Sequence, residues 1–325
     1  MPKWFVGCIF CFSAAMTSFS AASGNGDVMR LGLITPPPHQ WTKTATAIAA
    51  ELEKDGFSKK LSVFPSGQLG NEAQMLQLLQ TGAMDIGFFT TSELANRLPQ
   101  FAAFYTPYLA KDAAHAARIL SGTVAVEILA STRKIGLVGL GYGMAGMRQI
   151  VARGQVSGYG DLKGLKVRVV PDAPLTDFWY LAGTAPTAIP LSVLYDAFAN
   201  GQVDAMHIDF ENTLRLKFYQ HAKSVLYTDH MMFPMVALAS AKSWARMSED
   251  DKKYLNNVFQ KHLAVLLTSY VTADQGFKEK LIEEGVNIVK VDKDFFGDAP
   301  DNWYDRWSKR SPYVQKLKEE ADSVR

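Results

Sequence analysis

The chain contains the same helix-to-strand junction twice: a helix ends at glycine, two residues follow, and an aspartate then opens an apolar strand. The two copies are residues 79–88 (LQTGAMDIGF) and residues 198–207 (FANGQVDAMH). Glycine suits the left-handed conformation in which many helices end. Pro65 and Pro190 each stand before the helix of one copy and end the strand that precedes it. The repeat therefore predicts one strand–helix–strand unit that is used in two halves of the fold.

Strand-like and helix-like stretches alternate along the chain. This alternation favours an α/β fold in which each half is a mostly parallel sheet flanked by helices. Short apolar runs predict the strands, and apolar residues spaced three or four apart predict the helices. The predicted strands are 28–34, 61–64, 84–89, 135–140 and 165–170, and the predicted helices include 41–52 and 73–79.

An unusually long helix is predicted after Ser248. Ser248 and Asp251 resemble a capping box, only Gly276 interrupts the helix formers that follow, and Gly285 closes the pattern. A helix of roughly 35 residues is about 50 Å long, which exceeds the diameter of one small domain. We expect it to span both halves, and a coiled-coil contact between two chains is the alternative. The residues that suit burial in the core are Leu263, Leu266, Leu267 and Tyr270.

The first residues resemble a secretory signal. Lys3 supplies a positive start, residues 4–16 are apolar apart from one serine, and small residues gather in 18–23. We predict a cleavable signal peptide over residues 1–22 and export to the periplasm. An N-terminal membrane anchor is the alternative, but the apolar stretch is shorter than the roughly 18 residues that a span requires.

Cysteine and charge content narrow the class of protein further. Both cysteines, Cys8 and Cys11, lie in the predicted signal peptide, so the mature chain is expected to have no disulfide and no thiolate metal ligand. The formal net charge is +2, from 34 Lys and Arg against 32 Asp and Glu. This near-neutral charge excludes a polybasic nucleic-acid binder.

The sequence lacks the common motifs of enzymes and cofactor-binding proteins. There is no G-x-S-x-G, no H-E-x-x-H and no Walker loop, and the six histidines lack metal-ligand spacing, so we expect neither a metal nor a cofactor. Residues 141–146 (GYGMAG) match G-x-G-x-x-G. However, Gly154, Gly158 and Gly160 follow too soon for the long helix that a dinucleotide site needs. We interpret residues 141–146 as a flexible crossover between the halves.

Arg168 is the strongest candidate for a ligand contact. It alternates with apolar residues in 165–170 (LKVRVV), near the end of a strand that Pro171 terminates. Ligands of open α/β sheets bind outside the carboxyl ends of strands, and a guanidinium matches a carboxylate with two hydrogen bonds. The alternative is a strand arginine satisfied by a nearby acidic residue. Arg148 is a second candidate, for which an exposed surface charge is the alternative.

The strand ends of the repeated unit supply four more candidates. Phe88 and Thr90 lie at the end of one strand, and His207 and Asp209 lie at the end of the other. We expect all four to face a cleft between the halves, because an apolar wall with a few polar groups suits a small molecule. An exported enzyme is the alternative, with His207 and Asp209 on one strand face as acid and base.

Over nearly all of its mature length, the chain resembles the extracytoplasmic solute-binding proteins of tripartite ATP-independent periplasmic (TRAP) transporters. The most specific stretch is residues 161–169 (DLKGLKVRV), followed by 183–186 and 195–204. Further matching positions are 64–70, 107–109, His230 and Trp244. This resemblance implies a two-lobed periplasmic binding protein fold that closes on its ligand.

The resemblance also implies partners and lobe boundaries. The partners would be a small organic acid and the membrane subunits of an ion-driven transporter, and a free-standing ligand sensor is another possibility. We expect lobe I to comprise residues 23–145 plus about 234–273. We expect lobe II to comprise residues 146–233 plus about 274–325, with the long helix spanning both.

Two arginines correspond to ligand-binding positions of the family. Arg168 matches the arginine that forms a salt bridge with the substrate carboxylate, and Arg148 matches a position where many members carry a second ligand-contacting arginine. Many members also have a Glu-Asn pair shortly after the aspartate of the second copy, and its asparagine touches ligand. Here residues 205–208 (AMHI) stand instead, so Asp209 or His207 is expected to replace that contact.

Overall fold

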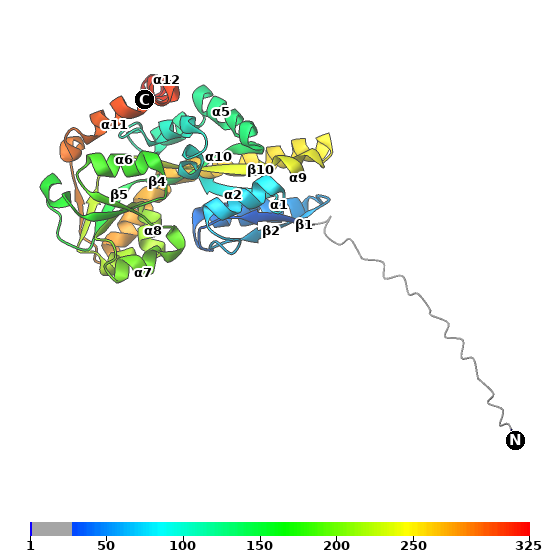
Figure 1. Ribbon diagram of the computed structural model, residues 1–325, viewed down its shortest axis with the longest axis horizontal. Helices are drawn as coiled ribbons and strands as arrows, with labels where there is room; N and C mark the ends of the chain where they lie inside the picture. Colours follow the sequence, from blue (N-terminus) through cyan, green and yellow to red (C-terminus); the bar gives the residue numbers. More distant parts are fainter. Residues whose placement is uncertain (2–27) are drawn as a thin grey trace.

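Two β-sheets with helices packed around them make up the chain (Figure 1). The computed structural model describes residues 28–325 and Met1, so the predicted signal peptide lies outside the described residues apart from Met1. Parallel strands alternate with helices in both halves, which confirms the predicted α/β class.

The first sheet has the strand order β2-β1-β3-β10-β4. Its strands are β1 (Val28–Gly32), β2 (Lys60–Phe64), β3 (Ile86–Thr90), β4 (Leu137–Met147) and β10 (Met232–Ser240). Strand β1 pairs in parallel with β2 and β3, whereas β10 runs antiparallel to β3 and β4.

The second sheet has the order β11-β9-β5-β8-β6-β7. Its strands are β5 (Gln149–Ala152), β6 (Lys166–Val169), β7 (Ala185–Ala188), β8 (Ala205–Ile208), β9 (Ser224–Tyr227) and β11 (Ile288–Lys290). Strand β6 is parallel to β7 and β8, while β5 is antiparallel to β8 and β9.

The sequence repeat corresponds to a structural repeat. The parallel trio β2-β1-β3 of the first sheet matches β7-β6-β8 of the second. In the first trio the Asp85 carboxylate accepts from the Arg30 N–H at 2.8 Å, and in the second the Asp204 carboxylate accepts from the Lys166 N–H at 2.8 Å. Each aspartate also donates its own N–H to the carbonyl of the same partner. The aspartate therefore fixes the start of β3 to β1 in the first trio, and the start of β8 to β6 in the second.

The glycine-rich segment differs from the prediction, because residues 141–146 form part of β4 and not a flexible crossover. A Cβ on Gly143 would lie 2.6 Å from Leu266, and a Cβ on Gly146 would lie 2.5 Å from the Asp274 carboxylate. Both partners belong to the long helix. The glycines therefore let that helix pack directly against the strand. The chain crosses from the first sheet to the second at Arg148, the single residue between β4 and β5.

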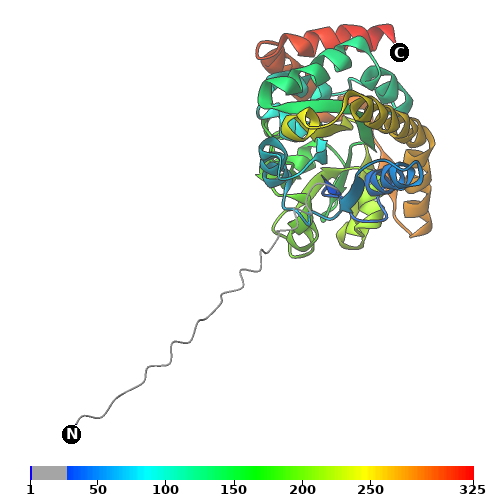
Figure 2. The same cartoon turned by 90° about the vertical axis from the view of Figure 1, so that its right-hand side faces the viewer.

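The long helix, α10 (Glu249–Glu283), has 35 residues and begins at Ser248, whose side chain accepts from the Asp251 N–H. It packs against α1 and β4 of the first half and α8 of the second, as predicted (Figure 2). The four residues predicted for the core, Leu263, Leu266, Leu267 and Tyr270, are buried, whereas Val265, Val271 and Ile282 of the same helix are exposed.

The other helices cover the two sheets. They are α1 (Gln40–Lys54), α2 (Glu72–Thr81), α3 (Thr91–Ala95), α4 (Ala113–Leu120), α5 (Thr123–Ala130), α6 (Ala173–Leu181), α7 (Leu194–Ala199), α8 (Phe210–Arg215), α9 (Ala241–Ala245), α11 (Ala299–Ser308) and α12 (Pro312–Ser323). The short 3-10 helices are η1 (Pro99–Tyr105), η2 (Ser131–Ile135), η3 (Tyr159–Leu162), η4 (Leu191–Val193), η5 (Phe218–His221) and η6 (Lys293–Phe296).

The C-terminal helices divide between the halves. Helix α11 packs against α6, whereas α12 packs against η1, α4 and α5 (Figure 1). We expected residues 274–325 to belong to lobe II, but α12 returns to elements that precede the crossing at Arg148. The exact lobe boundaries stay a prediction.

Over the described part of the chain, no single helix is long and apolar enough to cross a membrane. The bent pair 113–120 and 123–135 meets the criterion by length and composition only, and it packs against α12.

Candidate functional site

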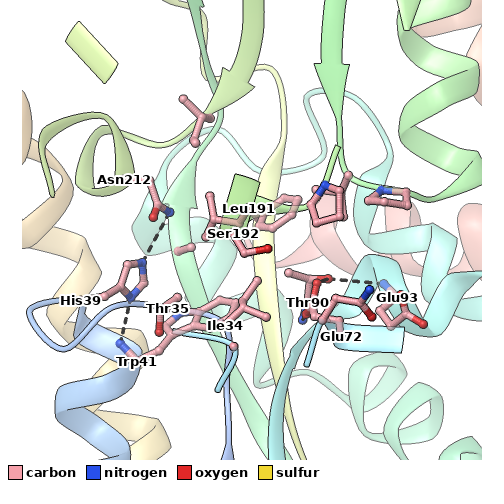
Figure 3. A pocket seen from close by; sticks show the side chains of 18 of the residues that line it. Ile34, Thr35, His39, Trp41, Glu72, Thr90, Glu93, Leu191, Ser192 and Asn212 are labelled. Atoms are coloured by element: carbon pink, nitrogen blue, oxygen red, sulfur yellow. Dashed lines mark hydrogen bonds between the residues drawn. The ribbon is translucent and has the colours of Figure 1, made fainter. Parts of the chain in front are cut away.

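A cavity of about 170 Å³ lies where the two halves of the fold meet (Figure 3). The first half supplies residues from the loop after β1, from α2 and from the end of β3. The second half supplies residues from β6, the loop after β7, β8 and α8, and the crossing segments supply Arg148 and Phe233. The polar side chains that line it are Thr35, His39, Asn71, Glu72, Thr90, Glu93, Arg148, Arg168, Ser192 and Asn212.

Arg168 lies in β6 and lines this cavity with only 3% of its surface exposed. Its Nε donates to the Ile189 carbonyl at 2.8 Å, which fixes the plane of the guanidinium. Among residues 28–325, the two terminal nitrogens have no hydrogen-bond or ion-pair partner. Burial, and then the neighbouring Arg148, lower the pKa of Arg168 to about 9. The side chain is therefore a buried cation whose two terminal nitrogens are available as donors.

Arg148 lies at the crossing between the sheets and has more partners than Arg168. Its guanidinium donates to the Asp209 carboxylate at 2.7 Å and stacks 3.3 Å above the ring of Phe233. Its backbone N–H donates to the Met231 carbonyl, and its own carbonyl accepts from the Thr228 hydroxyl. Burial lowers the pKa of Arg148, and Asp209 opposes that shift. Arg148 therefore borders the cavity with its charge already balanced.

Thr90 caps α3 at the end of β3 and lines the cavity together with Glu72. The two Glu72 oxygens accept from the Thr90 N–H at 2.5 Å and from its hydroxyl at 3.1 Å. Burial raises the pKa of Glu72 to about 7. Glu93, on α3, also lines the cavity and forms an ion pair with Arg97.

His39 and Asn212 come from opposite halves and meet at the cavity wall, where the Asn212 amide nitrogen lies 3.5 Å from the His39 Nε2 (Figure 3). The His39 Nδ1 accepts from the Trp41 N–H, so it caps α1 in neutral form, and burial lowers its pKa to about 3. The Asn212 amide donates to both Asp209 oxygens, at 3.1 and 2.9 Å. Next to it, Glu211 of α8 accepts from the Gln40 N–H at the start of α1.

Three of the six candidate residues from the sequence line the cavity: Arg168, Arg148 and Thr90. Asp209 lies behind Arg148 as its ion-pair partner and as the cap of α8. Phe88 turns away from the cavity and packs edge-on against Phe259 of α10.

His207 lies in the core and not at the cavity wall. It packs against Trp179, His230 and Phe233, and neither of its ring nitrogens has a partner among the described residues. Burial lowers its pKa well below the ordinary value. The cavity-lining residue of β8 is instead its neighbour Ile208.

Sequence reasoning missed Asn212, Glu72 and His39. A signal for Asn212 was present, because the Glu-Asn pair sought just after Asp204 occurs as Glu211-Asn212. The pair lies beyond β8, at the start of a short helix. Glu72 is the first residue of α2 and carries no distinguishing motif.

Comparison with known proteins assigns the family. The family model DctP, described as bacterial extracellular solute-binding protein, family 7, matches residues 31–310. The chain belongs to this family. It is therefore a solute-binding protein of the TRAP type, as the sequence resemblance predicted.

Two relatives match this family 7 protein over nearly the whole length of both chains. The sialic acid-binding periplasmic protein SiaP of Vibrio cholerae is 27% identical over 316 residues, covering 94% of this chain and 96% of SiaP. The 2,3-diketo-L-gulonate-binding periplasmic protein YiaO of Escherichia coli is 25% identical over 319 residues, covering 97% of this chain and 95% of YiaO.

Solved structures of TRAP periplasmic solute-binding proteins share the fold. One from Polaromonas, bound to D-erythronate, is 27% identical with a TM-score of 0.85, covering 92% of this chain and 99% of that one. One from Bradyrhizobium, in complex with galacturonate, is 27% identical with a TM-score of 0.84, covering 90% of this chain and 99% of that one. The family 7 protein thus has the predicted two-lobed fold with its cavity between the lobes.

Proposed function

We propose that this solute-binding protein captures a small organic acid in the cavity and delivers it to the membrane subunits of a TRAP transporter. The observation that carries the proposal is Arg168, a buried cation that lines the cavity and whose two terminal nitrogens are uncommitted among residues 28–325. A carboxylate can accept two parallel hydrogen bonds from a guanidinium, and the pair is strongest where water is excluded. Arg148 lies at the same cavity, with its charge already balanced by Asp209.

The relatives support the same ligand chemistry. Sialic acid, 2,3-diketo-L-gulonate, D-erythronate and galacturonate, which appear in their names, are all carboxylic acids. A cavity built from both halves also couples binding to closure, because a ligand held by Arg168 and by groups of the first half favours the closed arrangement.

The direct test is calorimetric titration with a panel of organic acids. We expect Arg168→Ala to weaken binding of the cognate acid by about 100-fold, since a hydrogen-bonded charge pair is lost. Arg133→Ala, which removes an exposed arginine outside the cavity, is the matched control and should bind as the original protein does. Unchanged affinity in the Arg168 variant would reject the assignment.

The competing proposal, an exported enzyme with His207 and Asp209 as acid and base, has less support. His207 is enclosed by aromatic rings, and the Asp209 carboxylate is committed to Arg148 and Asn212. Neither side chain lines the cavity. Prolonged incubation with a bound acid, followed by mass spectrometry, distinguishes the two proposals, because a receptor returns the acid unchanged.

We also propose that the mature protein is periplasmic and begins near Ser23 after removal of residues 1–22. The charged start, apolar stretch and small-residue zone support this. Mass measurement of the chain recovered from the periplasm tests it: retention of residues 1–22 would favour a membrane anchor.

A further inference from the structure

The charges around the cavity balance in pairs, except for one cation and one acid. Leaving aside neutral His39, the ionisable side chains that line it are Arg148, Arg168, Glu72 and Glu93. Asp209 balances Arg148 at 2.7 Å, and Arg97 balances Glu93. Arg168 and Glu72 are left without an ion-pair partner among the described residues.

Glu72 is fixed as an acceptor on the wall contributed by the first half. Its two oxygens are held by the N–H and the hydroxyl of Thr90, and the side chain is buried. Above its pKa of about 7, Glu72 is ionised, and an ionised carboxylate can only accept hydrogen bonds, with a further lone pair on each oxygen. The group that a ligand presents to Glu72 must therefore be a donor.

Asn212 contributes a second acceptor on the wall of the other half. Because the Asp209 carboxylate can only accept, the Asn212 nitrogen must face it, at 2.9 and 3.1 Å. The Asn212 Oδ1 is buried and has no partner within residues 28–325. Glu72 and Asn212 thus both line the cavity that also holds the free donors of Arg168, and each has an acceptor oxygen with a lone pair to spare.

This distribution restricts the ligand. One carboxylate can pair with Arg168, and hydroxyl groups can donate to Glu72 and Asn212. A second ionised carboxylate would be buried without a free cation and close to Glu72, which is costly. Building an unpaired charge against one class of ligand is a general route to specificity.

Building on the proposed function, we propose that the cavity selects hydroxylated monocarboxylates and rejects the corresponding dicarboxylates, with Glu72 as a specificity-determining residue. The acid would bind through its carboxylate at Arg168 and direct its hydroxyl groups to Glu72 and Asn212.

Two matched pairs of probes test this: D-erythronate with meso-tartrate, and D-galactonate with galactarate. In each pair the second acid carries a carboxylate where the first carries a terminal alcohol. Calorimetry at pH 8 should show the monocarboxylate of the better-binding pair favoured by at least about tenfold. Equal or tighter binding of the dicarboxylate would overturn the proposal.

Variants separate this inference from the proposed function. Glu72→Gln keeps the shape and removes the charge, so it should reduce the preference within the pair several-fold, while Glu53→Gln, on the exposed part of α1, should not. An unchanged preference in a folded Glu72 variant would reject the role of Glu72. If Arg168→Ala abolished binding but Glu72→Gln left the preference unchanged, the receptor function would be supported and this specificity would be rejected. If none of these four acids bound but a dicarboxylate or an acid without hydroxyl groups from the wider panel did, the receptor function would stand and this specificity would be rejected.

Discussion

At the scale of single residues, the site depends on which buried charges are paired. Arg148 and Asp209 form a pair that is almost completely removed from water, with side-chain exposures of 4% and 0%. Such a pair adds little net stability compared with apolar residues, but removal of one partner leaves an unbalanced buried charge. Arg168 is already in that condition, because no acidic side chain among residues 28–325 forms an ion pair with it.

Asp209→Asn should therefore destabilise the ligand-free protein by about 3–5 kcal/mol. Asparagine can still cap α8, as Asp209 does through the Asn212 N–H, so the substitution isolates the charge. Urea unfolding provides the measurement. Asp322→Asn, in an exposed pair with Lys318, should change the free energy of unfolding by less than about 1 kcal/mol, and an equal loss in both variants would contradict this argument.

Glu72 gives a pH-dependent prediction. Its pKa is raised by burial from the ordinary 4.5 to about 7, with Glu93 raising and Arg168 lowering it. The folded state thus binds a proton more readily than the unfolded state, and this stabilisation is complete below about pH 4.5 and is lost as the pH rises to about 7.

Relative to the original protein, Glu72→Gln should therefore become more stable as the pH rises through that interval. The ratio of the two unfolding constants should change by up to about tenfold per pH unit. Urea midpoints measured at pH 4.5, 6 and 8 give the comparison. A constant difference between the two proteins over this interval would show that Glu72 ionises normally.

At the scale of elements, the main feature is the contact between β4 and α10, the long helix that packs against both halves. The strand lacks side chains at Gly143 and Gly146 because Leu266 and Asp274 of α10 occupy that space. Gly146 also has a φ of +76°, which L-residues rarely adopt. By contrast, Gly276 lies inside α10 with nothing within 4 Å of the position of a Cβ.

Alanine substitutions at these two glycines should consequently act in opposite directions. Gly276→Ala should stabilise the protein by about 0.5–1 kcal/mol, because glycine is a poor residue for a helix interior. Gly146→Ala should cost about 1–3 kcal/mol through backbone strain and displacement of Asp274. Thermal unfolding of the two variants measures both effects, and destabilisation by Gly276→Ala would mean that α10 needs flexibility at this point.

At the scale of the whole molecule, direct hydrogen bonds join the two halves on both sides of the cavity. The Asn96 side chain, after α3, donates to the Pro171 carbonyl at 2.9 Å. On the other side, the Gln40 N–H donates to Glu211 at 3.0 Å. Because each bond joins the two halves directly, both favour the arrangement in which the halves lie close together.

Asn96→Ala should shift the equilibrium towards an open arrangement, because one of these hydrogen bonds is lost. A typical hydrogen bond contributes about 1 kcal/mol, so ligand affinity should fall about fivefold. Small-angle scattering of the ligand-free protein should show a larger radius of gyration. Asn257→Ala, at an exposed position on α10, is the control. An unchanged radius together with unchanged affinity would mean that this bond does not bias closure.

How far the sequence predicted the site varies with the residue. The sequence located Arg168 and Thr90 because both lie at the ends of strands, and local signals such as Pro171 mark where a strand ends. It did not decide which side chain of β8 faces the cavity: Ile208 does, while His207 points into the core. A strand alternates its faces, so an error of one position exchanges lining and core residues.

The sequence by itself determined the repeated strand–helix–strand unit, the long helix and an arginine at the end of a strand. These features follow from periodicity, helix caps and turn residues, all of which act between neighbours along the chain. Only the tertiary structure decided that Arg148 is balanced by Asp209 and Glu93 by Arg97, leaving Arg168 and Glu72 without an ion-pair partner among the described residues. It also decided that the β4 glycines accommodate α10. Charge balance and close packing depend on distances through space between residues far apart in the chain, and no local pattern encodes those distances.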